Sequence, residues 1–265
     1  MELGLKEKVV LITGASAGIG KAAALAFASE GAILVLCARG EERLHETARE
    51  CEEHGAKVIT QVADVSKSED IESLFKRIVA DFGNLDVLIN NAGEGQRSLE
   101  ILPPDDVWQE HFDQYLMSVI RVTRLAIPLL KNNGGGRVIN ISSGNWKEPG
   151  EGSATRSTMK AAVTTLTKTL ANKLAREGII FNTVSPGLIE TERLSAPGSI
   201  GDSMARKAGK SIQEALGDYV EKNIPLGRLA TTEDVANVIV FLASNKAAGV
   251  LGSDYGVDAG GHKSL

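Results

Sequence analysis

The chain has few cysteines, no block of basic residues and no long hydrophobic run, and each shortage excludes a class of protein. Its two cysteines, Cys37 and Cys51, form neither a CxxC pair nor a metal-type spacing with histidine, so we predict reduced thiols rather than a disulfide or metal site. The formal net charge is −5, which argues against a nucleic-acid partner. No apolar run approaches the roughly 18 residues of a membrane span, and residues 1–4 lack the charged and apolar regions of a signal peptide. We therefore expect a cytoplasmic protein that acts on small molecules, without nucleic acid or membrane.

What the chain does have is the composition of one α/β unit. Its 265 residues are 43% hydrophobic and 24% charged, which suits one large core, so we predict a single domain over 1–265. Apolar runs typical of buried strands alternate with helical patterns. The expected strands are 9–12, 32–38, 57–62, 85–89, 137–141 and 179–184, and a long helix is expected over 153–177. This alternation predicts a doubly wound parallel sheet of Rossmann type, with about seven strands and helices on both faces.

The most informative stretch is the turn Thr13–Gly20, which follows an apolar run and opens a helical segment. Glycine permits positive φ and lets a phosphate approach the bare backbone, while the free N–H groups at a helix start favour negative charge. The spacing is TGxxxGxG rather than GxGxxG. Because a strand and a helix flank the turn, we predict that it cradles the phosphates of a nucleotide.

Two further segments give local predictions. Ser66 and Glu69 have the spacing of a capping box at the start of a helix. Residues 192–225 interrupt the alternation with Pro197, several glycines and a weak helical pattern. We interpret this segment as a mobile substrate lid, with an ordinary loop as the alternative.

Three more motifs follow the ends of predicted strands. Asn90-Asn91-Ala92-Gly93 comes after the fourth strand, Asn140-Ile141-Ser142-Ser143 ends the fifth, and Ser185-Pro186-Gly187-Leu188-Ile189-Glu190-Thr191 follows the sixth. Together with the glycine turn and the ending 251–261, they resemble the short-chain dehydrogenase/reductase family from about residue 6 to Gly261. The carboxyl ends of parallel strands form the ligand crevice of an open α/β sheet, so the physical reading agrees with the resemblance.

The resemblance implies a nicotinamide dinucleotide and assigns residues to its parts. The pyrophosphate would lie against Gly14, Ser16, Gly18, Ile19 and Gly20, the adenine beside Asp64 and Val65, and the ribose beside Asn91, Ala92 and Gly93, while Pro186, Gly187, Ile189 and Thr191 would hold the carboxamide. Arg39 stands at the end of the second strand, where an acidic residue would bond a 2′-hydroxyl, and its guanidinium can instead bind a 2′-phosphate. NADP(H) is therefore favoured over NAD(H), with a solvated surface arginine as the alternative reading of Arg39.

The catalytic positions depart from the family pattern. The family places a tyrosine thirteen residues after the active-site serine and four before a lysine, and here Ser143 and Lys160 keep their places while residue 156 is Arg156. By the resemblance, Ser143 orients the substrate oxygen and Lys160 holds the ribose, but an arginine does not give up a proton near neutrality. Tyr115 stands at the position of the family's active-site asparagine. We treat Tyr115 as a candidate relocated proton donor, with packing between helices as the alternative, and interpret His111 as helix surface.

Arg156 and Lys160 are four residues apart, so two cations share one helix face. One hypothesis is that Arg156 clamps an anionic group of the substrate as a bidentate partner. The alternative is that Arg156 turns outward and pairs with Glu148 or Glu151. The spacing does not decide between them.

Three functions fit these residues. The first is NADP(H)-dependent hydride transfer to or from a small carbonyl or alcohol, with an atypical proton donor and no metal. The alternatives are a non-redox enzyme on the same scaffold and a catalytically silent dinucleotide-binding protein. Family members usually assemble through the two long helices and the final strand, so we expect a homotetramer, with a dimer as the alternative.

Overall fold

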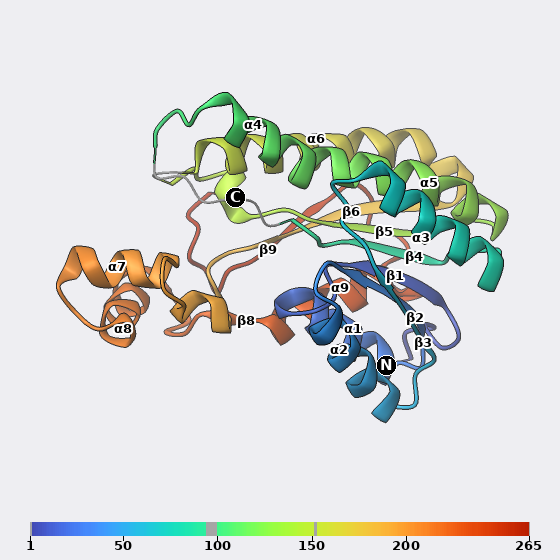
Figure 1. Ribbon diagram of the computed structural model, residues 1–265, viewed down its shortest axis with the longest axis horizontal. Helices are drawn as coiled ribbons and strands as arrows, with labels where there is room; N and C mark the ends of the chain where they lie inside the picture. The colour runs from blue at the N-terminus through green and yellow to red at the C-terminus, as the bar shows by residue number, and fades with distance from the viewer. Residues whose placement is uncertain (1, 94–99, 151–152, 265) are drawn as a thin grey trace.

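A seven-stranded parallel sheet forms the centre of the computed structural model, which describes residues 2–93, 100–150 and 153–264 (Figure 1). Its strand order is β3–β2–β1–β4–β5–β6–β9. The strands are β1 (Val9–Thr13), β2 (Ile33–Ala38), β3 (Val58–Val62), β4 (Val87–Asn90), β5 (Gly136–Ile141), β6 (Ile179–Pro186) and β9 (Asp254–Val257). A second, two-stranded sheet pairs β7 (Ile189–Glu190) with β8 (Ala230–Thr231). The order reverses between β1 and β4, which is where this fold places its ligand crevice.

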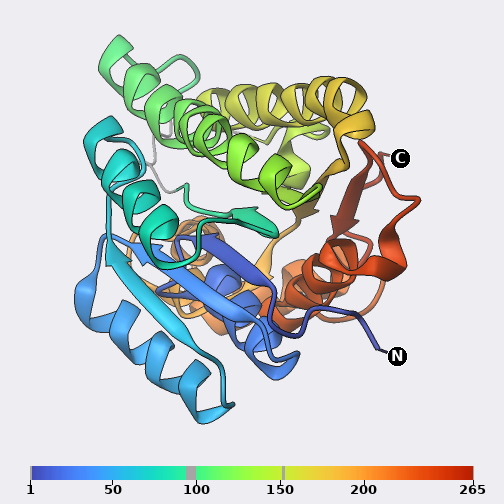
Figure 2. The same ribbon diagram turned by 90° about the vertical axis from the view of Figure 1, so that its right-hand side faces the viewer.

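Helices cover both faces of the large sheet (Figures 1 and 2). One face carries α1 (Gly18–Ser29), α2 (Glu41–Glu53) and α9 (Thr232–Ala243). The other carries α3 (Ser68–Asp81), α5 (Ser118–Asn132) and α6 (Ala154–Leu174), with α4 (Asp105–His111) and a π-helix (Phe112–Met117) leading into α5. Short 3₁₀ helices span Gly144–Trp146, Ala175–Glu177, Glu192–Ser195 and Asn245–Ala247. No helix within the described ranges is both long and apolar enough to cross a bilayer.

Two hydrophobic cores, one on each face of the large sheet, explain why the strands are continuous apolar runs in the sequence. Along β1, Val10 and Ile12 pack into the core beneath α1 and α9, whereas Leu11 packs into the opposite core beneath α3 and α5. Successive side chains of a strand point to opposite faces, so a strand covered on both sides must be apolar at every position. The predicted fold class, a doubly wound parallel sheet with helices on both faces, is confirmed.

Two local predictions were wrong. Helix α3 begins at Ser68 with Lys67 as its N-cap and no side-chain cap, so Ser66 lies one residue before the capping position, and its hydroxyl donates to Asp64 Oδ1 at 2.7 Å. The fourth strand starts later than predicted, at Val87. The preceding Asp86 carboxylate accepts hydrogen bonds from the backbone N–H of Val9 and the Nζ of Lys8, so it ties the strand's start to the edge of β1.

Residues 192–225 contain more helix than their sequence pattern predicted. They form a 3₁₀ turn followed by α7 (Ile200–Ala208) and α8 (Ile212–Asn223), which lie beyond one end of the sheet (Figure 1). Helix α8 begins with a reciprocal capping box between Ser211 and Glu214. Gly209, at φ +64°, ends α7 in the left-handed conformation. The two helices are short, and this break between them weakens the helical periodicity of the sequence.

Candidate active site

The turn between β1 and α1 has the shape of a phosphate cradle. Gly20 lies so close to the first glycine that a Cβ there would come within 2.2 Å of the Gly14 carbonyl oxygen. Gly18, at φ +55°, has no protein atom within 4 Å of the corresponding position, so open space faces it. The N-cap, Ala17, provides no side-chain cap to the first N–H groups of α1. Backbone donors beside open space at a helix start suit a pyrophosphate, so Gly14, Ser16, Gly18, Ile19 and Gly20 could hold one.

The end of β4 is fastened to this turn. The Asn91 amide donates to the carbonyl oxygens of Thr13 at 3.0 Å and Gly14 at 3.1 Å. In return the Thr13 hydroxyl accepts the backbone N–H groups of Asn91 and Ala92, each at 3.0 Å. Two segments that are 78 residues apart in sequence therefore form one wall, and Asn91, Ala92 and Gly93 adjoin the cradle as the fold requires.

Arg39 and Asp64 stand at the neighbouring ends of β2 and β3. Arg39 is exposed, and Val65 is buried beside Asp64. Burial opposes ionisation of Asp64, but hydrogen bonds from Ser66 and the charge of Arg39 hold the pKa of this carboxyl below its usual value. An exposed guanidinium at this edge could bind a phosphate by two parallel hydrogen bonds.

Ser143 and Lys160 lie at the end of β5. Ser143 is buried, and its Oγ accepts a long hydrogen bond of 3.4 Å from the Asn145 N–H. Lys160, on α6, is also buried, and its Nζ donates to the Ile141 carbonyl at 2.6 Å. Burial, assisted by the charge of Arg156, lowers the pKa of Lys160 from 10.5 to about 7.

Tyr115 lies in the π-helix and faces Lys160. The lysine Nζ is 5.3 Å from the centroid of the Tyr115 ring, and the ring is 4% exposed. A Cβ at Gly93 would lie 2.9 Å from Tyr115 Cδ1 and 3.8 Å from Lys160 Nζ. The glycine that ends the β4 motif therefore leaves room for both side chains. Single turns of π-helix occur frequently at functional sites, where they redirect a side chain.

His111 is buried, so its interpretation as helix surface was wrong. Its Nδ1 lies 2.6 Å from the Thr155 hydroxyl on α6, and its ring meets the Tyr115 ring edge-on at a centroid distance of 5.1 Å. No local pattern indicates this contact, because Thr155 is 44 residues away from His111. The contact connects the helix that carries Tyr115 to the helix that carries Lys160.

Arg156 is exposed, one helical turn before Lys160. The outward pairing with Glu148 is not formed, since the Glu148 carboxylate accepts the backbone N–H groups of Lys263 and Ser264 instead. Glu151 lies outside the described residues. Within the described part of the chain Arg156 has no ion pair, and the residue is exposed to solvent.

The carboxyl end of β6 supplies the remaining predicted cofactor residues. Pro186 ends this strand, and Gly187 lies so close to the C-terminal segment that a Cβ there would meet Asp258 Cβ at 2.6 Å. Ile189 is buried in β7, and Thr191 precedes the 3₁₀ turn that begins the segment 192–225. The predicted cofactor residues thus follow the carboxyl ends of the strands along one edge of the sheet, from β3 to β6.

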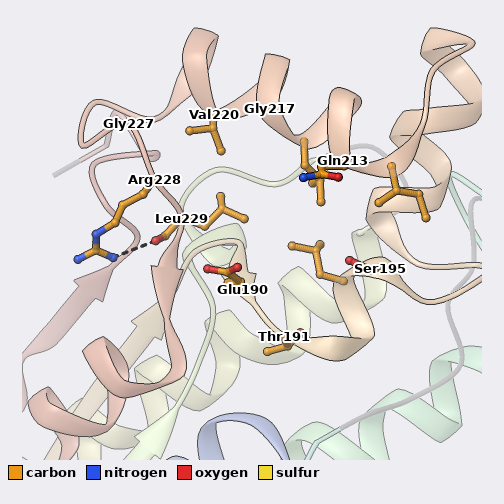
Figure 3. A pocket seen from close by; sticks show the side chains of 12 residues that line it. Glu190, Thr191, Ser195, Gln213, Gly217, Val220, Gly227, Arg228 and Leu229 are labelled. Atoms are coloured by element: carbon orange, nitrogen blue, oxygen red, sulfur yellow. Dashed lines mark hydrogen bonds between the residues drawn. The ribbon is translucent and has the colours of Figure 1, made fainter.

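A cavity of about 540 Å³ lies between α8 and the small sheet (Figure 3). Leu194, Leu216 and Leu229 give it apolar walls, and Glu190 and Arg228 lie on its polar side. It shares only Thr191 with the predicted cofactor residues, and Ser143, Lys160, Tyr115 and Arg156 do not line it. The cavity is therefore separate from the group around Lys160.

Both cysteines are structural. Cys37 and Cys51 are buried, and burial is the main cause that raises the pKa of each thiol to about 12. They are consequently protonated at neutral pH, and neither has the lowered pKa of a reactive thiol. Across the described ranges, no group of histidine, cysteine, aspartate and glutamate side chains is arranged to hold a metal ion.

The sheet, its glycine turn and the motifs at the ends of β4, β5 and β6 define a Rossmann-type dinucleotide-binding scaffold. A family model described as enoyl-(acyl carrier protein) reductase matches residues 14–262. The 3-oxoacyl-(acyl-carrier-protein) reductase FabG of Thermotoga maritima is 35% identical over 258 residues, which cover 97% of this chain and 98% of that protein. The uncharacterized oxidoreductase YvrD of Bacillus subtilis is 34% identical and covers 100% of both chains.

A solved structure agrees with these relatives. L-sorbose reductase from Gluconobacter frateurii, complexed with NADPH and L-sorbose, matches at a TM-score of 0.93 with 34% identity and covers 100% of both chains. This chain belongs to the short-chain dehydrogenase/reductase family, as its motifs indicated. That Arg156 and Tyr115 occupy the family's tyrosine and asparagine positions stays a prediction from spacing.

Proposed function

We propose that the protein is an NADP(H)-dependent oxidoreductase that transfers a hydride to or from a small carbonyl or alcohol substrate. The observation that carries this proposal is the meeting of Lys160, Tyr115 and Gly93 beside the carboxyl ends of β4 and β5. When bound, the dinucleotide supplies the hydride. The glycine turn would hold its pyrophosphate, Asp64 and Val65 its adenine, the Asn91–Gly93 segment its ribose, and Pro186, Gly187, Ile189 and Thr191 its carboxamide.

Arg39 supports the preference for NADP(H). It is exposed at the end of β2, and among the described residues its guanidinium forms no hydrogen bond or salt bridge, although its charge acts on Asp64. The nearby Asp64 is occupied by Ser66, so its carboxylate already has two donors. The related reductase of known structure was also complexed with NADPH.

The proton in this reaction would come from Tyr115. Arg156 cannot supply it, because a guanidinium keeps its proton in neutral solution. Tyr115 carries an ionisable hydroxyl on a ring that faces Lys160, and the lysine holds the ribose in relatives of this type by the family resemblance. Ser143 would orient the substrate oxygen, and residues 192–225 would close over it.

Arg156 would select the substrate. Its accessible guanidinium, next to a buried lysine, favours a substrate that carries a carboxylate or another anionic group near the reacting carbon. Such a group would also offset the repulsion between Arg156 and Lys160.

The function is tested by measuring the oxidation of NADPH and of NADH with a panel of neutral and carboxylated carbonyl compounds. The wild type is compared with Tyr115→Phe. We expect turnover with NADPH, and a fall in kcat of about 10²-fold or more in Tyr115→Phe with unchanged NADPH binding, because only the proton donor is lost. Arg156→Tyr restores the family's pattern and should rescue Tyr115→Phe.

The outcomes separate the alternatives. Turnover that is equal in the wild type and Tyr115→Phe would contradict the relocated donor but keep the oxidoreductase. If every variant binds NADPH but only Arg156→Tyr turns it over, the natural protein is a catalytically silent dinucleotide-binding protein. A product formed without any change in NADPH absorbance would indicate non-redox chemistry.

A further inference from the structure

The C-terminal segment 258–264 connects two parts of the site that are far apart in sequence. At one end it contacts the chain just after the segment 192–225: the Leu226 N–H donates to the Ala259 carbonyl at 3.2 Å. A Cβ at Gly261 would come within 2.7 Å of Ile224 Cδ1, so this contact is close. At the other end the N–H groups of Lys263 and Ser264 donate to the Glu148 carboxylate, just beyond the loop that follows Ser143.

Inside this segment Asp258 holds the imidazole of His262. The distance from His262 Nδ1 to Asp258 Oδ2 is 2.7 Å, and the same carboxylate accepts the N–H groups of His262 at 3.0 Å and Gly260 at 2.9 Å. Burial opposes ionisation, but these hydrogen bonds lower the pKa of Asp258. With Nδ1 and the backbone both bonded to one carboxylate, the ring has a fixed orientation.

The fixed ring lies against Gly144, the residue after Ser143. A Cβ at Gly144 would lie 2.0 Å from His262 Cε1 and 2.3 Å from its Nε2, which are impossible contacts. The ring also approaches the end of β6, since a Cβ at Gly187 would lie 3.5 Å from His262 Cε1. His262 therefore fills the space between the carboxyl ends of β5 and β6, at the crevice where this fold binds its ligands.

The loop after Ser143 is held on its other side by Asp254. Its Oδ2 accepts the Trp146 indole N–H at 3.1 Å, and its Oδ1 accepts the Ser185 hydroxyl at 2.6 Å. Between this anchor and the one on Glu148, the His262 ring packs against the backbone of Gly144, the residue directly after Ser143. The Ser143 Oγ has one long internal hydrogen bond, which is too weak to define the loop alone.

We propose that His262, fixed by Asp258, is a positioning residue that sets the conformation of the Ser143–Glu148 loop and thereby aims the Ser143 hydroxyl. The consequence for catalysis rests on the proposed function, in which Ser143 orients the substrate oxygen. The effect on the loop does not rest on the proposed function, because it follows from the contacts of His262 with Gly144 and Asp258.

A fluorescence experiment tests the effect on the loop without any substrate. The chain has two tryptophans, so Trp108→Phe leaves Trp146, inside the loop, as the sole indole reporter. In this background we expect His262→Ala to lower the fluorescence anisotropy of Trp146 and shift its emission. His54→Ala, which removes an exposed histidine after α2, is the matched control and should change neither.

A double-mutant cycle makes the test specific. Gly144→Ala alone should disturb the Trp146 signal as strongly as His262→Ala, because its methyl group cannot coexist with the ring. Gly144→Ala added to His262→Ala should have little further effect, because the obstructing ring is gone. Additive effects, or a Trp146 signal in His262→Ala that equals that of His54→Ala, would overturn the proposal.

Kinetics of the same variants test the consequence for Ser143. A displacement of about 1 Å can cost 10²-fold in rate, so we expect His262→Ala to lower kcat about 10- to 100-fold while KM for NADPH stays within about twofold. A lowered melting temperature with unchanged kcat would show a purely structural role and contradict the positioning. If the wild type turns over nothing, the proposed function fails while the fluorescence cycle still decides the effect on the loop.

Discussion

Lys160 is a buried cation whose hydrogen-bond partner is a neutral carbonyl, that of Ile141. A carboxylate partner would offset the desolvation of the ammonium, and among the described residues none forms an ion pair with it. Arg156, one turn away, adds repulsion. Both effects favour the neutral amine and bring the pKa to about 7, so the charge of Lys160 changes near physiological pH. A group that switches there can respond to the proton transfer proposed for Tyr115.

The lowered pKa predicts a pH-dependent stability. The unfolded lysine keeps its proton up to about pH 10.4, while the folded one releases it above about pH 7. Between these values the unfolded state binds more protons, so the free energy of unfolding rises with pH, by at most about 1.4 kcal/mol per pH unit from this group. Lys160→Met removes the effect. We expect the stability of Lys160→Met relative to wild type to be highest below pH 7 and to fall steadily towards pH 10.

Urea denaturation at pH 6, 7.5 and 9 measures this difference, and Lys173→Met, at an exposed position of the same helix, is the control. The hydrogen bond lost to Ile141 adds an offset that is the same at every pH. A difference between Lys160→Met and wild type that stays constant across the three values would show that Lys160 is charged in the folded protein throughout this range.

For single residues, the sequence predicted where a side chain lies along a helix better than which way that side chain points. The four-residue spacing of Arg156 and Lys160 placed them one turn apart on α6, yet one is exposed and the other buried, which spacing alone does not determine. The burial of His111 depends on Thr155 from a distant segment, and the packing of His262 depends on Gly144. Each contact joins residues more than 40 positions apart, so neither has a local pattern that would reveal it.

Among the elements, the turn between β1 and α1 combines two different demands on glycine. Gly20 is required by packing, because a Cβ would meet the Gly14 carbonyl at 2.2 Å and Asn91 Nδ2 at 2.6 Å. Gly18 has positive φ but open space beside it, which is the space a cofactor would need. The same change, glycine to alanine, should therefore affect stability and cofactor binding differently at Gly20 and at Gly18.

Gly20→Ala should lower the free energy of unfolding by about 1–3 kcal/mol, the range for an overpacked site. Gly18→Ala should lower it by about 1–2 kcal/mol through its left-handed backbone and also weaken NADPH binding at least tenfold, or by about 1.4 kcal/mol. Gly55→Ala, at φ +81° in an open turn after α2, reports the backbone strain without any effect on NADPH. Calorimetry and NADPH titration measure the two quantities. Undiminished NADPH affinity in Gly18→Ala would contradict the phosphate cradle.

The strands, which have a continuous apolar pattern, were predicted well. Helix boundaries that depend on individual hydrogen bonds were not. The strands followed from apolar runs because both faces of the sheet are covered. The start of α3 did not follow from its sequence, because the N-cap is Lys67 and Ser66 lies one residue too early to cap the helix. Helices α7 and α8 were underestimated because each is short, although the capping box at Ser211 was readable in the sequence.

For the whole molecule, the order of the motifs was enough to predict the doubly wound sheet and the edge that carries the site. Parallel strands bring their carboxyl ends to one side, so motifs after β1, β4, β5 and β6 had to converge. The part played by the C-terminal segment 258–264 could not be predicted, since it depends on how β9 joins β6 and returns the chain to Gly144. The cavity beneath α8 likewise depends on tertiary packing that no motif encodes.

At the scale of the whole molecule, the exposed surface indicates how copies of this chain assemble. Strand β9 is at the edge of the large sheet, and Phe241 on the adjacent α9 is 40% exposed. An open strand edge beside an exposed aromatic side chain favours pairing with a second copy. We expect a homotetramer in which the final strand and α9 form one of the interfaces.

Phe241→Asp should divide this tetramer into dimers, because it removes an apolar contact worth about 1.5–3 kcal/mol per side chain and places a charge there instead. Val62→Asp is the matched control: Val62 is 44% exposed on β3, at the opposite edge of the large sheet from β9, so the tetramer should persist. Sedimentation velocity distinguishes four chains from two. A tetramer that survives Phe241→Asp would place its interfaces elsewhere, with the long helices α5 and α6 as the remaining surface. Dissociation by both substitutions would mean that the β3 edge also contributes. A symmetric interface repeats each contact, so even a modest loss per side chain should shift the assembly at micromolar concentration.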